Sequence, residues 1–221
     1  MPYPQPRHVR IFRAVGAPIL RLIMRIGCRV TLSGMENIPP YGPYLIAINH
    51  LATYDAPLAV LFWPYFPEGI TAAANFPAPF IGHLVRWYGA IPVQHHGEYD
   101  RIALETALTV VRSGSQLLIA PEGHRTFKPG MKEARPGVAY LALKANVPIV
   151  PVGLTGTETL MPSWKRLRRP HLTMTVGKPF CLPEEPLTRE DRHEKLTEYT
   201  TLIMKKIAEL LPVEYRGVYG S

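Results

Sequence analysis

His50 and Asp55 are the two residues of this sequence best suited to acid–base chemistry. They lie between Tyr44 and Asp55, in a segment whose apolar run ends just before the histidine. A neutral imidazole can take a proton from an alcohol near neutral pH. A carboxylate on its other ring nitrogen fixes the tautomer and stabilises the imidazolium that forms. Such a pair needs no serine or cysteine nucleophile.

The spacing of His50 and Asp55 requires a turn between them. Residues five apart on a helix lie about 140° from each other and cannot face one another. The sequence places the turn between a buried strand at residues 44–48 and a helix at 56–66 that has Pro57 in its first turn. A histidine at a strand end lies where α/β proteins place catalytic residues. Taken alone, this pattern is more typical of a solvated loop histidine and an aspartate that only caps a helix.

Three further blocks follow in the order and approximate spacing of one protein family. They are Ile91-Pro-Val93, the segment Leu118 to Thr126 that contains Pro121-Glu122-Gly123-His124-Arg125, and the segment Val147 to Gly153. Together with Asn49, His50 and Asp55, they resemble the glycerolipid acyltransferases typified by 1-acylglycerol-3-phosphate acyltransferase. The resemblance runs from about residue 34 to about residue 179, and the ordered set is far more specific than any single block.

The resemblance implies transfer of a fatty acyl group from a thioester to the sn-2 hydroxyl of 1-acylglycerol-3-phosphate, which gives phosphatidic acid. In this family, the histidine matching His50 deprotonates the acceptor hydroxyl and the aspartate matching Asp55 orients it. The donor is acyl-CoA or acyl carrier protein, which present the same phosphopantetheine thioester. We expect no further cofactor and no metal.

A cluster around Arg125 is expected to bind the acceptor. Gly123 permits a sharp turn after an apolar strand, and Arg125 then emerges at the same sheet edge as His50, with a planar fork that suits a phosphate. Lys128 adds a second charge, and Glu122 is expected to hydrogen-bond the loop or the acceptor. The alternatives are a surface arginine for Arg125 and a loop or helix-cap carboxylate for Glu122. The neighbouring blocks favour the binding roles.

The sequence departs from the family pattern at positions that usually help to bind the acceptor phosphate. His124 stands where threonine is common, residues 94–96 read Gln-His-His where an arginine is frequent, and residues 72–76 lack a lysine. Another lysophospholipid or hydroxylated lipid is therefore an alternative acceptor, with Arg86 or Arg101 as other sources of charge. The adjacent histidine pair lacks the spacing of metal ligands, which favours a solvated loop.

Residues 7–30 predict a basic amphipathic helix that binds a membrane surface. The arginines on one face are Arg7, Arg10, Arg13, Arg21, Arg25 and Arg29, and the apolar residues on the other are Val9, Phe12, Val15, Ile19, Leu22, Ile23, Ile26 and Val30. Such a helix can lie in the headgroup plane, with its arginines on anionic phosphates. No run approaches the roughly 18 uncharged residues needed to span a bilayer. Pro18 is expected to kink or split the helix.

The commoner alternative for such a helix is that its apolar face packs on the protein's own core. The confinement of the arginines to one face of the helix favours membrane binding. We expect a peripheral protein on the cytoplasmic face of the membrane. No signal-peptide pattern is present, and the distant pair Cys28 and Cys181 suggests no disulfide framework. A second basic cluster, residues 164–169, suits an interface contact but is almost as typical of a solvated loop.

Composition indicates one globular domain with a lipid-facing appendage. The chain has 221 residues, 47% of them hydrophobic, and a net charge of +8, which calls for an anionic partner such as a membrane surface, a lysophospholipid, coenzyme A or acyl carrier protein. Nucleic acid is not expected, because no recognition motif occurs. We expect residues 1–33 to form the membrane-associating segment and residues 34–221 the α/β acyltransferase domain.

Short apolar strands alternate with amphipathic segments along the chain. This pattern predicts an α/β fold with a mixed, largely parallel sheet flanked by helices. Strands are expected near residues 46, 71, 91, 118, 149 and 172–176, and helices at 80–88, 100–112, 138–144 and 189–211. Residues 147–153 contain two prolines and are expected to form an edge strand that shapes the acyl pocket. The tail after Pro212 is expected to be frayed.

Two other classes of function remain open from the sequence. A non-catalytic module that binds lipid or acyl carrier protein would keep the fold without turnover, although intact His50, Asp55 and Arg125 argue against it. A thioester or phosphoester hydrolase would use water in place of the alcohol. The absence of a Gly-x-Ser-x-Gly elbow argues against a serine hydrolase, and no P-loop or dinucleotide fingerprint supports a nucleotide-driven reaction.

Overall fold

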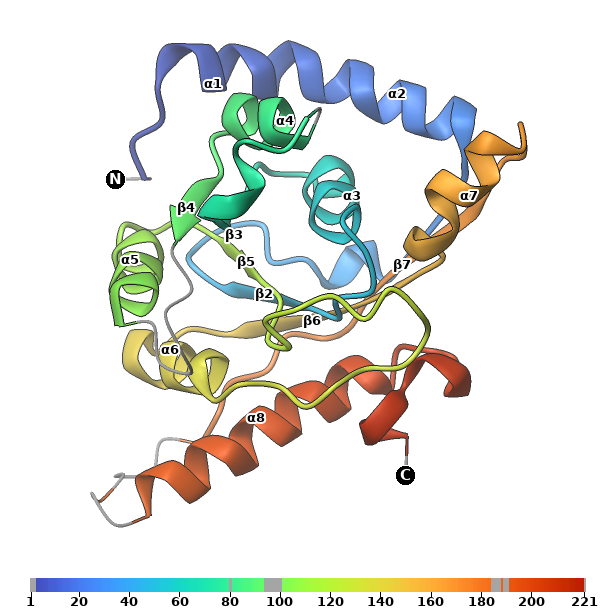
Figure 1. The fold of residues 1–221 in the computed structure, drawn as a ribbon. Helices are drawn as coiled ribbons and strands as arrows, with labels where there is room; N and C mark the ends of the chain where they lie inside the picture. The colour runs from blue at the N-terminus through green and yellow to red at the C-terminus, as the bar shows by residue number, and fades with distance from the viewer. Residues whose placement is uncertain (1–2, 80, 94–100, 184–187, 189–190, 221) are drawn as a thin grey trace.

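A seven-stranded sheet runs through the centre of the computed structural model, which describes residues 3–79, 81–93, 101–183, 188 and 191–220 (Figure 1). The strands are β1 (Arg29–Ser33), β2 (Leu45–Ile48), β3 (Glu68–Ala72), β4 (Ile91–Val93), β5 (Leu117–Ile119), β6 (Ile149–Thr155) and β7 (His171–Val176). Their order is β1-β7-β6-β2-β5-β3-β4, and all pairs are parallel except β6 with β7. The predicted mixed α/β fold is confirmed.

Helices cover both faces of the sheet. The described helices are α1 (Arg7–Ile11), α2 (Ala17–Gly27), α3 (Asp55–Phe62), α4 (Ile81–Tyr88), α5 (Arg101–Arg112), α6 (Gly137–Ala145), α7 (Leu160–Lys165) and α8 (Arg192–Ala208). In β2, Leu45 and Ala47 pack with α5, α6 and α8, whereas Ile46 and Ile48 pack with α3. This alternation places one apolar core on each side of the sheet, which explains why the central strands are apolar throughout.

The segment at residues 147–153 is not an edge strand, so that prediction is wrong. β6 lies between β7 and β2, and all of its residues are buried. Pro151 is tolerated there because its nitrogen faces a break in the β7 ladder. That ladder begins at Val152, and the carbonyl of Pro151 accepts the N–H of Gly177 beyond the end of β7. β6 therefore lies in the sheet interior, and none of its residues is among those that line the pocket beside His50.

The N-terminal helix ends at Gly27, earlier than predicted. A π-helical turn, Phe12–Gly16, joins α1 to α2 just before Pro18, which has no N–H to donate. The last part of the predicted helix, including Arg29 and Val30, forms edge strand β1 and pairs with β7. Residues 29–33 are thus part of the sheet, although the division of the chain at residue 33 stays a prediction.

Two arginines assigned to the lipid headgroups point into the protein instead. Arg13 is buried, forms an ion pair with Glu68 at 2.7 Å and donates to the carbonyl of Tyr88 at 3.0 Å. Arg21 donates to the carbonyls of Leu61 and Trp63. A buried cation needs such partners, and these hold the helix on the core. Of the apolar residues predicted on the opposite face, Val9 is buried and Phe12 is half-buried, whereas the others within α1 and α2 and the turn between them are exposed: Val15, Ile19, Leu22, Ile23 and Ile26.

The tail after Pro212 is ordered, and the expectation of fraying is wrong. Two short 3-10 helices, Val213–Tyr215 and Gly217–Tyr219, pack against the segment around Met131. The hydroxyl of Tyr219 accepts the N–H of Ala134 at 3.0 Å. The tail therefore supports the loop that follows the Glu122 block.

Candidate active site

His50 is delivered by the end of β2, and Asn49 fixes its position. The side chain of Asn49 donates to the carbonyl of Leu154 at 2.9 Å and accepts the N–H of Leu154 at 2.7 Å. These two hydrogen bonds are buried and join the end of β2 to β6. Asn49 thus acts as a backbone-like clamp directly before His50, so the imidazole emerges from a fixed strand end.

His50 and Asp55 are brought together as predicted. The Nδ1 atom of His50 lies 2.9 Å from Oδ2 of Asp55, and the His50 side chain is 21% exposed while that of Asp55 is fully buried. Asp55 is the first residue of α3, and its Oδ2 also accepts the N–H of Ala52 at 2.6 Å. Because the carboxylate accepts from Nδ1, the free Nε2 carries the lone pair that a general base needs.

Thr157 completes the surroundings of Asp55. Its hydroxyl donates a short hydrogen bond to Oδ1 of Asp55, and both side chains are buried. Gly156 precedes Thr157 with a positive φ of 82°, and a Cβ there would lie 2.0 Å from the carbonyl oxygen of His171. Only glycine fits this turn after β6, which aims Thr157 at the carboxylate. All the donors around Asp55 therefore orient it toward His50.

Glu122 binds two backbone amides in this structure. Its Oε1 accepts the N–H of His50 at 2.7 Å, and its Oε2 accepts the N–H of Lys132 at 2.8 Å. The side chain is buried, and desolvation raises the pKa of Glu122 above its ordinary value despite these hydrogen bonds. Of the two roles left open for Glu122, this geometry supports contact with the loop.

The raised pKa of Glu122 predicts a pH-dependent contribution to stability. When the pKa of a carboxyl group is higher in the folded state than in the unfolded state, its contribution to stability is largest at pH values below the unfolded-state pKa, here 4.5. The contribution is lost as the pH rises through the folded-state pKa. We therefore compare the free energy of unfolding of the wild type with that of Glu122→Gln. The wild-type value minus the variant value should fall as the pH rises from about 4.5. Urea unfolding of both proteins at several pH values measures this difference. A difference that rises with pH would contradict the direction of the shift.

Arg125 reaches the same edge of the sheet as His50. Its Nη1 donates to the hydroxyl of Thr53 at 2.8 Å, within the turn between His50 and Asp55. The chain after Arg125 also pairs with that turn, because the N–H of Thr126 binds the carbonyl of His50 at 3.1 Å. Gly123 has a positive φ of 72°, which suits the sharp turn predicted there. The histidine turn and the arginine block thus form one hydrogen-bonded unit.

A pocket of about 550 Å³ opens beside this unit. His50, Gly123 and Arg125 line it together with apolar side chains from the N-terminal helix, α3, α4, α5 and α6. β3 pairs with β5 only at Glu68 and Gly69, and its remaining residues pair with β4. The strands β3 and β5 therefore separate after Gly69, and the pocket lies at this separation. The pocket therefore joins a polar site at the histidine to an apolar interior that can hold a hydrocarbon chain.

The remaining sequence candidates lie in different places. Lys128 is exposed and is not among the residues lining the pocket. Arg86 and Arg101 are exposed as well, and Arg101 forms an ion pair with Glu105 on α5. The Gln-His-His segment at 94–96 lies outside the described residues. In the part of the chain that the structure describes, His, Cys, Asp and Glu side chains form no group that could hold a metal.

Sequence reasoning missed Thr157 and the hydrogen bonds that Asn49 makes to Leu154, and it assigned no role to Arg135. Arg135 lines the pocket, and its side chain lies beside Gly123, where a Cβ would approach it at 3.4 Å. An arginine near the Glu-Gly block is a signal that could have been weighed for phosphate binding. Thr157 offered no such signal, because it is 102 positions from Asp55 along the chain.

Comparison with known proteins shows the family of the chain. Residues 29–155 match the family model described as Acyltransferase. The chain belongs to the acyltransferase family. The chain is 32% identical over 155 residues to a 1-acyl-sn-glycerol-3-phosphate acyltransferase of Chlamydomonas reinhardtii, a match that covers 68% of this chain and 46% of the relative. It is 26% identical over 207 residues to the human 1-acyl-sn-glycerol-3-phosphate acyltransferase alpha, covering 87% of this chain and 71% of the relative.

The chain also shares its fold with a solved structure. The crystal structure of PlsC from Thermotoga maritima, a 1-acyl-sn-glycerophosphate (LPA) acyltransferase, superposes with a TM-score of 0.63 at 20% identity and covers 88% of this chain and 80% of that one. This likeness shows the fold. The chain spans about half the length of several curated relatives, with 46%, 52% and 49% of three of them covered.

Proposed function

We propose that this protein transfers a fatty acyl group from acyl-CoA or acyl carrier protein to the sn-2 hydroxyl of 1-acylglycerol-3-phosphate. The observation that carries the proposal is the placement of His50. Its Nδ1 faces a fully buried Asp55 at 2.9 Å, and the residue lines a largely apolar pocket. An oriented base beside a space for a hydrocarbon chain suits acylation of an alcohol. The names of the relatives support this acceptor.

The reaction follows from this arrangement. Nε2 of His50 takes the proton of the acceptor hydroxyl as its oxygen attacks the thioester carbonyl carbon. The carbonyl π electrons move to oxygen, and a tetrahedral oxyanion forms. When the oxyanion collapses, the carbon–sulfur bond breaks and the leaving thiolate takes the proton from His50. Asp55 stays ionised throughout and stabilises the imidazolium between the two proton transfers.

Charge at the pocket suits an acceptor that carries a phosphate. Arg125 and Arg135 both line the pocket on the side of Gly123, and Arg125 is tied to the histidine turn through Thr53. A guanidinium binds phosphate with two parallel hydrogen bonds, so Arg125 can place the acceptor hydroxyl near His50. Lys128 is exposed outside the pocket and would add a longer-range attraction.

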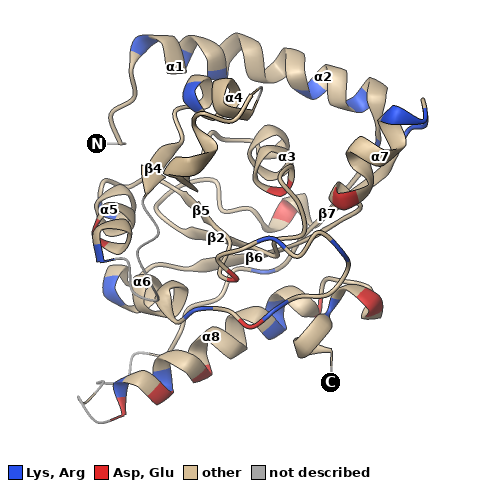
Figure 2. Ribbon diagram, in the orientation of Figure 1, with Lys and Arg blue, Asp and Glu red and all other residues tan. Residues whose placement is uncertain are grey.

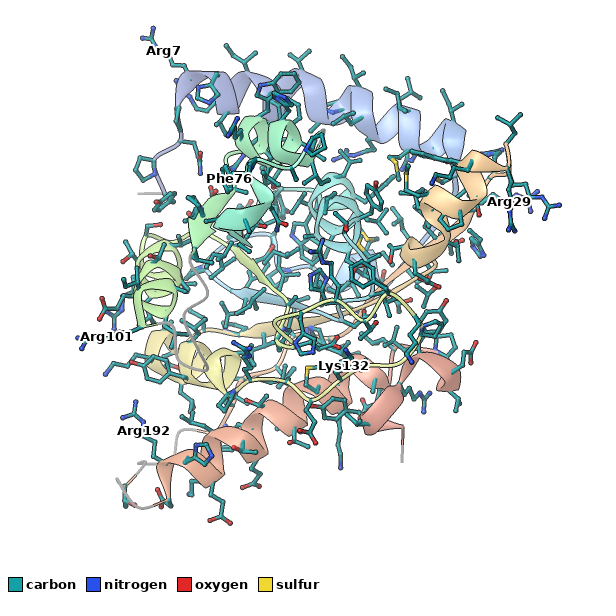
Figure 3. All side chains as sticks on the ribbon, in the orientation of Figure 1. Arg7, Arg29, Phe76, Arg101, Lys132 and Arg192 are labelled. Atoms are coloured by element: carbon teal, nitrogen blue, oxygen red, sulfur yellow. The ribbon has the colours of Figure 1, made fainter. Side chains whose placement is uncertain are left out.

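The N-terminal helix suits a peripheral position on the cytoplasmic face of a membrane. Its exposed apolar residues are Ile11, Val15, Ile19, Leu22, Ile23 and Ile26, each at least 51% accessible to solvent. We call these residues the apolar stripe. Figure 3 shows carbon-only side chains projecting from the outer side of α1 and α2. No helix in the described part of the chain is long and apolar enough to cross a membrane. A stripe of this kind can enter the interface between head groups and acyl chains.

A comparison of acceptors tests the proposed substrate. Product formation from acyl-CoA should be measured in mixed micelles with 1-acylglycerol-3-phosphate, with a lysophospholipid whose phosphate carries choline, and with a monoacylglycerol. We expect the phosphomonoester acceptor to give the highest kcat/KM, and Arg125→Ala to remove most of that preference. A higher kcat/KM with either other acceptor would contradict the proposed substrate but not the proposed acyl transfer.

Thr157→Val should lower kcat by about tenfold or more with little change in KM. Loss of a hydrogen bond to a buried charged group costs roughly 1.5–3 kcal/mol, and here it frees Asp55 from the geometry that serves His50. Thr157→Ser keeps the hydroxyl and should retain most of the activity. In an Asp55→Asn background, Thr157→Val should add little further loss, because Thr157 acts through the carboxylate. Equal losses in both backgrounds would indicate a purely structural role.

A further inference from the structure

The connection between α7 and β7 carries an exposed basic and apolar tip. Leu167 is 97% exposed and has a positive φ of 53°, which is rare for a leucine. Lys165, Arg166 and Arg168 surround it and are exposed, and none of them forms an ion pair within the described part of the chain. Figure 2 shows blue, the colour of Lys and Arg, at the end of α7 and in the connection that follows it. Among the described residues, the leucine side chain therefore has almost no contacts, and the three cations have no acidic partner.

The tip is fixed to the C-terminal end of α2. The indole N–H of Trp164 donates to the carbonyl of Gly27 at 3.0 Å. Nη2 of Arg169 donates to the carbonyls of Arg25 and Cys28 at 2.9 and 3.0 Å. These bonds satisfy carbonyls at a helix end, where a cation is also favoured by the helix dipole. The tip is thus held beside the helix that carries the apolar stripe (Figure 1).

We propose that residues 165–168 bind an anionic lipid bilayer and extend the membrane surface formed by the apolar stripe. Leu167 enters the boundary between head groups and acyl chains, and the three cations bind lipid phosphates. The inference rests on the membrane association proposed for the N-terminal helix. A bilayer fits better than an acidic protein because the tip joins an existing apolar surface and presents its own fully exposed leucine.

A second point of contact has a consequence for the pocket. A single helix lying on a bilayer leaves the protein free to rotate about the helix axis. Contact at Leu167, on a separate segment that is tied to the C-terminal end of α2, would restrict this rotation. The pocket, whose wall includes Phe12 and Leu20 of the same helical segment, is then held at a constant orientation to the membrane that contains its lipid substrate.

Sedimentation with lipid vesicles tests the proposal directly. The probes are vesicles of phosphatidylcholine with and without phosphatidylglycerol. The combined substitution Lys165→Glu, Arg166→Glu and Arg168→Glu should weaken partitioning onto the anionic vesicles by at least roughly 100-fold. Leu167→Ser should weaken it by roughly tenfold. The matched control reverses three exposed cations on other parts of the protein, with Arg112→Glu, Lys178→Glu and Lys205→Glu. It makes the same change in net charge and should bind several-fold to tens-fold better than the tip variant.

Turnover in micelles of a neutral detergent separates this proposal from the proposed reaction. The tip variant should keep wild-type kcat there, because no anionic surface is present and the pocket is unchanged. Wild-type vesicle binding by the tip variant, or equal losses in the tip and control variants, would overturn the proposal whether or not the protein transfers acyl groups. Unchanged vesicle binding with a selective loss of turnover from acyl carrier protein would overturn it in favour of an acidic protein partner.

Discussion

His50→Ala should lower kcat/KM for acyl transfer by about a thousandfold while the protein remains folded. General-base catalysis by a positioned histidine contributes roughly 10²–10⁴-fold, and the pocket holds no other imidazole bonded to a buried carboxylate among the described residues. The fold should be retained, because Asp55 keeps its hydrogen bonds from Ala52 and Thr157 when the imidazole is removed. Thiol release from acyl-CoA in the presence of the acceptor measures the effect.

A matched histidine substitution makes this result interpretable. His83 is exposed on α4 and is not among the pocket residues. His83→Ala should keep activity within a few-fold of wild type, and both variants should show the same thermal unfolding midpoint within a few degrees. Activity of His50→Ala above about one-tenth of wild type would exclude His50 as the general base.

Asp55→Asn should lower kcat by about 100-fold, and Asp55→Ala by about a thousandfold. The amide oxygen of asparagine can still accept from His50 and from the N–H of Ala52, and its amide group can donate to Thr157. Orientation is therefore largely kept, but the negative charge that stabilises the imidazolium is lost. Alanine removes the charge and the orientation together, and it leaves the N–H of Ala52 without its acceptor.

The difference in kcat between Asp55→Asn and Asp55→Ala separates the effect of the carboxylate charge from its effect on orientation. Steady-state kinetics should show the loss mainly in kcat, because Asp55 is fully buried and is not among the residues that line the pocket. Asp55→Ala should also lower the free energy of unfolding more than Asp55→Asn does. Equal activity of the wild type and Asp55→Asn would mean that the carboxylate only positions the loop.

The local arrangement around His50 was predictable because its causes are local. An apolar run, a short turn and Pro57 are enough to specify a strand end followed by a helix, and that geometry brings His50 to Asp55. Thr157 was not predictable in the same way. It reaches Asp55 only because β6 lies beside β2 and because Gly156 turns the chain after β6. Such a contact depends on strand order, which the sequence does not state.

The N-terminal helix shows a different limit of sequence analysis. A helical wheel separates Arg13 and Arg21 from the apolar stripe, but it does not say which side faces the core. The arginines face the core because Glu68 and the carbonyls of Leu61 and Trp63 accept their hydrogen bonds. Those partners are supplied by β3 and by the end of α3, far along the chain. The edge position predicted for residues 147–153 failed for a related reason, since the ladder break that accommodates Pro151 appears only in the folded sheet.

The most direct test of the proposed function is acceptor dependence of thioester cleavage. Wild-type protein in anionic mixed micelles should be given acyl-CoA carrying a labelled acyl group, with and without 1-acylglycerol-3-phosphate. Thiol release and labelled phosphatidic acid should then be measured together. We expect release to require the acceptor, to match the labelled product mole for mole, and to disappear with His50→Ala. Equal thiol release without acceptor, accompanied by free fatty acid, would identify a hydrolase and contradict acyl transfer.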